Sequence, residues 1–542
     1  MKKIKNILIM SIIAVVGFGV INQFIGTAAE TNPDKVLNLS VATEPIMDPA
    51  YVTDSYSMPM IKNIFEGLTR PTNDGEIVPA MAESWDISED GKTYTFNIRE
   101  GVQWSNGDPV TAQDFDYAWK RILNPETAAP NASKLFIIEG AEEFFMGEAA
   151  EEDVQIKVTD DATFEVTLKE AAPYFIELAA RQVTMMPVHK ATVEQDAMTW
   201  ASEAGDTFVS NGPFIFTEWN HYGDYTLERN PNYWDVDNVD LEGVHVRIIE
   251  TAQTANMSFT NGELDFIGIP FNTVPADAID EYRASDELEV TEIGATYMYK
   301  LNTTDEVMQN VNIRKALSLA INRQQLIDNV VKGSQTAALG AIAPTVAGFE
   351  EDRGYFADGD YEKAREFLAQ GIEELGYENP AELPIKIQTN DNDSHMAVAQ
   401  YIQNEWQEEL GVAATIETAE LSVHFESMNQ LNFQIGRIGP TVDFNSAFAF
   451  LEHYYDADSG SNKTGWEDAE YQAILDEVIS EEDPAKQDEM YREAEGILMD
   501  AMPFIPIYYY SNPQVKSDRL DGLFVDGMVD VQLKEVTLIN AE

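Results

Sequence analysis

The residue types in this chain that could do chemistry are carboxylates, aromatic rings and a few histidines. The sequence holds 95 Asp and Glu against 34 Lys and Arg, with six His and no Cys. It contains neither the nucleophile elbow G-x-S-x-G, nor the zinc-protease pattern H-E-x-x-H, nor the phosphate loop G-x-x-x-x-G-K-[ST]. Without Cys, disulfides and thiolate chemistry are excluded. The sequence therefore disfavours a hydrolase or peptidase, and we predict no cofactor.

One partial metal-binding pattern lies at residues 456–467. The residues at the ligand positions of an EF-hand-like loop are Asp456, Asp458, Gly460, Asn462, Thr464 and Glu467. The glycine that such a loop requires at its sixth position is replaced by Ser461, and no clear helix precedes the loop. A polar surface loop is the favoured interpretation, and a calcium site is the alternative.

The charge balance excludes two classes of partner. The formal net charge is -61, so the chain would be repelled by nucleic-acid phosphates and by anionic membrane surfaces. High charge can also indicate disorder, but 44% of the residues are hydrophobic, which is enough for folded cores. We therefore predict a folded, acidic protein of two to four domains that binds no nucleic acid.

The first 29 residues have the pattern of an export signal. Lys2, Lys3 and Lys5 precede an apolar stretch at residues 7–21, and small residues follow at 27–29. The apolar stretch is short for a spanning helix of ~20 residues, so a cleaved signal peptide is favoured over an uncleaved membrane anchor. The mature chain is then expected to be extracytoplasmic, secreted or associated with the cell surface. With no Cys, it has no residue for lipid attachment at a lipobox.

Strand and helix patterns alternate irregularly along the chain. Period-two alternation predicts strands at 36–41, 93–98 and 163–168, and helical spacing predicts helices at 313–331, 361–375 and around 398–410. Gly376 and Gly411 are the expected stops of the last two helices. This mixture indicates α/β lobes and not a barrel or a solenoid, and no internal repeat is visible.

Two segments are dense in aromatic rings with polar groups, at residues 230–235 and 506–510. Such rings suit ligand clefts that contain water. Ordinary core packing is the alternative, and it is favoured for most of these rings.

Five ordered blocks of the sequence resemble a known family, the extracytoplasmic oligopeptide-binding proteins of peptide ABC transporters (solute-binding protein family 5). The block at 80–121, which reads AMAESWDISEDGKTYTFNIREGVQWSNGDPVTAQDFDYAWKR, is the most specific. The other blocks are at residues 46–68, 210–220 with 227–235, 301–331 and 502–512. The resemblance covers essentially all of the expected mature chain.

This resemblance implies an α/β, periplasmic-binding-protein-like (type II) fold with three lobes that close around a cleft by hinge motion. Lobe I would combine residues 37–65, 190–295 and 512–542, lobe II would span 66–189, and lobe III would span 296–511. The hinge would lie near residues 295 and 512. The implied protein is a non-enzymatic monomer that delivers short peptides to the permease subunits of an ABC importer.

The family's peptide site carries over residue by residue. Asp443 matches the aspartate that binds the peptide α-amino group, and Tyr117 matches a tyrosine that assists it. The other matched positions are Gly439 and Thr441, which pair with the peptide backbone, Thr53, Asp54 and Ser55 on the opposing strand, and Arg437 and His395, which are linked to the peptide carboxylate. Affinity would then come from backbone groups that every peptide shares.

The sequence departs from the family at Pro440, where relatives usually have Trp, and the pocket residues Leu421 and Met428 also differ. These changes leave the preferred peptide open, so a selective receptor for a signalling peptide of the pheromone type remains the alternative function. A nickel- or haem-binding relative is disfavoured because those ligands have no α-ammonium group for Asp443.

Overall fold

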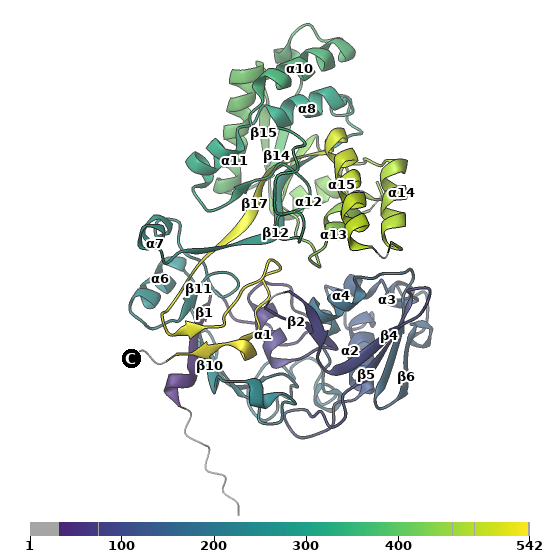
Figure 1. The fold of residues 1–542 in the computed structure, drawn as a ribbon, viewed down its shortest axis with the longest axis vertical. Helices are drawn as coiled ribbons and strands as arrows, with labels where there is room; N and C mark the ends of the chain where they lie inside the picture. Colours follow the sequence, from purple (N-terminus) through teal and green to yellow (C-terminus); the bar gives the residue numbers. More distant parts are fainter. Residues whose placement is uncertain (1–31, 74, 458, 482, 540–542) are drawn as a thin grey trace, which may run out of the picture.

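The computed structural model describes residues 32–539 apart from 74, 458 and 482, so the predicted signal at 1–29 lies outside the described residues. The described chain forms an upper and a lower body joined by a pair of long strands (Figure 1). Within these residues, no helix combines the length and apolar character needed to cross a membrane.

The lower body contains two four-stranded sheets (Figure 1). In the first, of order β1-β10-β9-β8, β1 is parallel to β10 and the other pairs are antiparallel; in the second, β4-β5-β7-β6, every pair is antiparallel. The strands are β1 (Val36–Val41), β8 (Phe214–Asn220), β9 (Asp224–Arg229), β10 (Gly243–Ile248), β4 (Ala82–Ile87), β5 (Thr93–Ile98), β6 (Ile156–Asp160) and β7 (Thr163–Thr167). The three predicted strands are thus confirmed, the third ending one residue early.

Helix α2 (Ala112–Leu123) packs against the second sheet through an aromatic contact. The buried ring of Trp119 meets Phe164 edge-on at 5.1 Å, and the alternating inward residues of β5 and β7 complete this core. The other lower helices are α1 (Ser57–Ile64), α3 (Ala141–Phe145), α4 (Phe175–Arg181), α5 (Lys190–Val193), α6 (Ala252–Thr260) and α7 (Ile279–Ser285). Two small antiparallel sheets pair β2 (Thr69–Pro71) with β3 (Ile77–Pro79) and β18 (Leu520–Asp521) with β19 (Thr537–Leu538).

A seven-stranded mixed sheet has the order β11-β17-β12-β16-β14-β15, with β13 paired to β17. It forms the centre of the upper body, except that β11 pairs with the lower end of β17 and lies beside β1 in the lower body (Figure 1). Helices surround it (Figure 1). The strands are β11 (Phe266–Ile267), β12 (Glu289–Leu301), β13 (Thr336–Ala337), β14 (Lys386–Asn390), β15 (Thr415–Ala419), β16 (Ile435–Ile438) and β17 (Phe504–Lys516). The helices are α8 (Val311–Leu319), α9 (Arg323–Leu326), α10 (Tyr361–Leu375), α11 (Asp393–Glu405), α12 (Leu421–Asn429), α13 (Ala447–Leu451), α14 (Ala469–Val478) and α15 (Pro484–Ala501).

Strands β12 and β17 run from the upper body to the lower one (Figure 1). They are antiparallel, and their register shifts between Glu292 and Thr296, opposite Ser511 and Tyr509. Such an irregularity bends a strand and increases its twist locally. The positions predicted for the hinge, near 295 and 512, fall on this part of the two strands.

Two of the three predicted helices are confirmed, and the third is wrong in its continuity. Helix α10 ends at Gly376 and the helix that starts with α11 ends, after a π-helical turn, at Gly411; both glycines have the positive φ of a helix C-cap. The segment 313–331 is broken after α8, because Asn322 accepts a hydrogen bond from the Gln325 N–H at 2.9 Å and starts α9.

Candidate functional site

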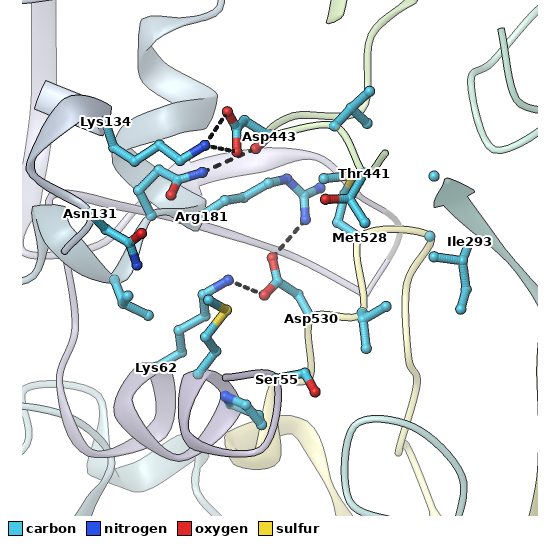
Figure 2. A pocket seen from close by; sticks show the side chains of 18 of the residues that line it. Ser55, Lys62, Asn131, Lys134, Arg181, Ile293, Thr441, Asp443, Met528 and Asp530 are labelled. Carbon is cyan, nitrogen blue, oxygen red and sulfur yellow. Dashed lines mark hydrogen bonds and ion pairs between the residues drawn. The ribbon is translucent and has the colours of Figure 1, made fainter. Parts of the chain in front are cut away.

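A cavity of about 410 Å³ lies where the upper and lower bodies meet, and Figure 2 shows its lining. One side is formed by the segment before α1, the segment around residue 131 and the end of α4. The other side is formed by β12, the segment after β16 and the C-terminal segment near residue 528. The lining includes Thr53, Ser55, Lys62, Lys134, Arg181, Gln182, Gly294, Thr441, Asp443 and Asp530.

The segment after β16 continues alongside β12, and none of the described residues pairs with the backbone on its other edge at Gly439 and Thr441. Thr296 donates its N–H to the Pro440 carbonyl at 3.4 Å, and Val442 donates to the Gly294 carbonyl at 3.3 Å. In an antiparallel pair, alternate residues direct their backbone groups to the same side. The N–H and C=O groups of Gly439 and Thr441 therefore point away from β12, as an added strand would require.

Gly439 also needs the absence of a side chain. A Cβ built there would lie 2.6 Å from the Tyr510 hydroxyl oxygen, far inside van der Waals contact. The close approach of Tyr510 to this backbone explains why a glycine stands beside Pro440.

Asp443 lies at the end of this segment and faces a lysine from the lower body (Figure 2). The Lys134 ammonium donates to both carboxylate oxygens of Asp443, each at 2.6 Å. Both side chains line the cavity and remain partly exposed, at 36% for Lys134 and 44% for Asp443. The carboxylate thus accepts hydrogen bonds from an alkylammonium group, the chemistry that the family resemblance assigned to Asp443.

A second carboxylate, Glu452, lies near this pair. Burial, and after it the negative charge of Asp443, raise the pKa of Glu452 to about 7 against the opposing positive charge of Lys134. The surroundings of Asp443 therefore hold a group that titrates near neutral pH.

The predicted opposing segment reaches the same cavity. Thr53 and Ser55 both line it. The Asp54 carboxylate instead accepts hydrogen bonds from the Ser57 N–H at 2.8 Å and the Ser57 hydroxyl at 2.7 Å. Asp54 therefore holds the start of α1 with its side chain, which leaves its backbone for any contact with a ligand.

Arg437 and His395 belong to a separate aromatic cluster beyond Gly439. The Arg437 guanidinium lies over the Tyr297 ring at 4.6 Å and donates to the Tyr510 hydroxyl at 3.1 Å, and His395 lies 3.3 Å from the Tyr297 hydroxyl. Among the described residues, Arg437 forms no ion pair and its buried Nε has no hydrogen-bond partner. Burial, followed by the charge of Arg437, lowers the pKa of His395 to about 4. Arg437 is therefore a cation with spare donors.

An ionic network forms the floor of the cavity. Arg181 donates to Asp526 at 2.6 Å and to Asp530 at 2.8 Å, and Lys62 pairs with Asp530 (Figure 2). Its members are at most 11% exposed at the side chain. Arg181 also pairs with Glu177 one turn earlier in α4, at 2.8 Å. The pairs of Arg181 and Lys62 with the two aspartates, and the pair of Lys134 with Asp443, join residues more than 300 positions apart, and no local pattern in the sequence marks them.

Tyr117 lies away from these groups. Its half-buried ring packs against the core from α2, 5.2 Å from the Lys190 ammonium, and it does not line the described cavity with Asp443. Of the predicted residues, the structure thus brings together Thr53, Ser55, Thr441 and Asp443, places Gly439, Arg437 and His395 farther along, and leaves Tyr117 apart.

The loop at 456–467 is organised around an internal cation. The buried Lys300 ammonium donates to the carbonyls of Asn462, at 2.7 Å, and Ser461, and burial lowers the pKa of Lys300 to about 7. The Asn462 side chain is used within the loop, where it bonds Thr464. Among the described residues, no group of three or more acidic or His side chains gathers to hold a metal. Asp458, one of the six candidate ligands of the loop, lies outside the described residues, so the polar loop and the calcium site stay alternative predictions.

The chain is similar to known proteins in both sequence and fold. A profile of the family described as "Bacterial extracellular solute-binding proteins, family 5 Middle" matches residues 76–462. The chain is 41% identical to the oligopeptide-binding protein OppA of Bacillus subtilis, over 92% of each chain, and 34% identical to the dipeptide-binding protein DppE of the same organism, over 91% of this chain and 90% of that one. The crystal structure of Haemophilus influenzae OppA in complex with the peptide RPPGFSPFR aligns with a TM-score of 0.71 at 26% identity, over 94% of this chain and 100% of that chain.

Proposed function

We propose that this chain, which belongs to the bacterial extracellular solute-binding proteins of family 5, is a receptor that binds short peptides and delivers them to an ABC importer. The single observation that supports a peptide most directly is the unpaired backbone edge at Gly439 and Thr441, which ends at the carboxylate of Asp443. An extended peptide adds a strand to such an edge, whatever its sequence.

The two charged groups on this segment match the two ends of a peptide. The α-ammonium binds Asp443, and the α-carboxylate is received by the spare donors of Arg437. Arg437 and Asp443 are six positions apart, which is about 20 Å in an extended chain. A peptide of about six residues, antiparallel to the segment, therefore reaches both, and a shorter peptide reaches one.

Binding would act by closing the lobes. The proposed lobes are residues 37–65, 190–295 and 512–542 for lobe I, 66–189 for lobe II and 296–511 for lobe III. The register shift between β12 and β17 is the proposed hinge, and permease subunits would recognise the closed monomer. The protein would be exported by the signal at residues 1–29 and would leave the peptide uncleaved.

Calorimetry with a panel of unrelated peptides of two to eight residues tests this function. We expect many sequences to bind, with affinity levelling off near six residues, and mass spectrometry to recover every peptide intact. Tight binding of one peptide sequence, with no measurable binding of the others, would favour a signalling receptor. Peptide cleavage would indicate a peptidase, and absence of any binding would contradict the proposal.

Arg437 provides a separate prediction about the carboxyl end. Replacing Arg437 with Met removes the guanidinium, so hexapeptides with a free α-carboxylate should bind about tenfold more weakly, the loss of one charge-assisted hydrogen bond. The same hexapeptides with an α-amide should bind the Met variant and the unchanged protein alike. Calorimetry on the four combinations measures this coupling.

The control is Arg365→Met, which removes an arginine of the upper body that pairs with Glu409 at 3.2 Å, outside the cavity. It should leave the affinity for both forms of the hexapeptide unchanged. An equal loss for acid and amide in Arg437→Met would show that Arg437 only supports Tyr297 and Tyr510.

A further inference from the structure

In the Lys134–Asp443 ion pair, the lysine ammonium is bound to the same carboxylate that is proposed to bind the α-ammonium group of a peptide. Lys134 belongs to a 3-10 turn of the lower body and Asp443 to the segment after β16. The Lys134 ammonium donates to both oxygens of Asp443 at 2.6 Å. A lysine ammonium and a peptide α-ammonium are the same chemical group with three N–H donors. The two are therefore competitors for one carboxylate.

The exposure of the pair makes it exchangeable. More than a third of each side chain is accessible, so Lys134 can leave Asp443 and be solvated at little cost. The Arg181–Asp530 pair in the same cavity is different, since its side chains are 4% and 6% exposed and separation would leave buried charges.

Asp443 is held in place by contacts that do not involve Lys134. Gln182 donates its side-chain amide to the Asp443 carbonyl at 3.4 Å, and the Asn445 N–H donates to Glu177 at 3.0 Å. Between them, the Phe444 ring stacks on Tyr174 with centroids 4.4 Å apart. The segment would therefore keep its position against α4 after Lys134 was removed.

We propose that Lys134 is a specificity-determining residue that competes with the peptide amino terminus for Asp443. The inference rests on the proposed function. A peptide with a free α-ammonium displaces Lys134 from Asp443. The cost of breaking this ion pair offsets part of the favourable free energy of peptide binding. A peptide without that charge leaves the ion pair in place. Lys134 thus lowers the affinity for free amino termini selectively.

Lys134→Met tests the proposal with paired peptides, one free and one N-acetylated, measured by calorimetry. We expect the free peptide to bind about two- to fivefold more tightly, the range set by a partly exposed ion pair, and the acetylated peptide to bind as before. Lys134→Gln should behave in the same way, and agreement between the two variants would show that the effect does not come from misfolding of one of them. In an Asp443→Asn background, the gain should disappear.

The matched control is Lys169→Met. Lys169 pairs with Glu142 at 2.7 Å, and these side chains are 34% and 47% exposed, close to the values of the Lys134 pair, but Lys169 does not line the cavity. Its loss should change neither affinity.

Three results would overturn the proposal. Weaker binding of free peptides by both Lys134 variants would show that Lys134 positions Asp443 and does not compete with the ligand. Equal changes in affinity for free and acetylated peptides would show that the ion pair only holds the upper and lower bodies together. If the unchanged protein bound no peptide at all, the proposed function would fail with the inference, and this result is separate from the other two.

Discussion

Asp443→Asn is expected to weaken the binding of peptides with a free amino terminus by about 10- to 150-fold. The substitution keeps the shape of the side chain but removes the charge, and a hydrogen bond to a charged group is worth about 1.5–3 kcal/mol. Calorimetry at pH 7 with one peptide in free and N-acetylated forms measures the loss.

The acetylated peptide should bind the unchanged protein far more weakly than the free one, and Asp443→Asn should change that weak binding little. Glu142→Gln is the control, since Glu142 has nearly the exposure of Asp443 and pairs with a lysine outside the cavity. Equal affinity of the unchanged protein for free and acetylated peptides would remove Asp443 from the proposed site.

Elements whose signals are local were predictable from the sequence. Strand β5 could be placed because its alternate residues face a core, and helix α10 because its apolar spacing ends at a glycine with positive φ. The segment 313–331 was mispredicted because apolar spacing continues past Ala320, whereas the side chain of Asn322 starts a new helix. Capping by one side chain outweighed the periodicity.

The candidate site was predictable only in part. Family resemblance located the segment that ends at Asp443, but pairing across the fold decides what each side chain contacts. Lys134 meets Asp443 across 309 positions, and Lys300 meets the loop at 461–462 across about 160. No pattern in one sequence reveals such pairs, because the partner's distance in space is set by the register of the sheets and not by the spacing along the chain.

The largest expected effect on stability is that of Arg181→Met. Arg181 donates to Asp526 and Asp530, and its side chain is 4% exposed. Methionine fills similar volume but leaves Asp526, Asp530 and the less buried Glu177 without their shared arginine, and Lys62 pairs only with Asp530. Removing one partner of a buried ion pair costs about 3–5 kcal/mol. The free energy of unfolding, measured by urea titration with circular dichroism, should fall by that amount.

Two further variants separate the loss of charge from the loss of packing. Arg181→Met combined with Asp526→Asn removes one unpaired carboxylate and should recover part of the lost stability. Arg365→Met removes a half-exposed arginine and should cost less than about 1 kcal/mol. If Arg181→Met alone cost no more than this control, Lys62 would be sufficient to neutralise both aspartates. The floor of the cavity would then be held by the packing around the C-terminal segment and not by its charges.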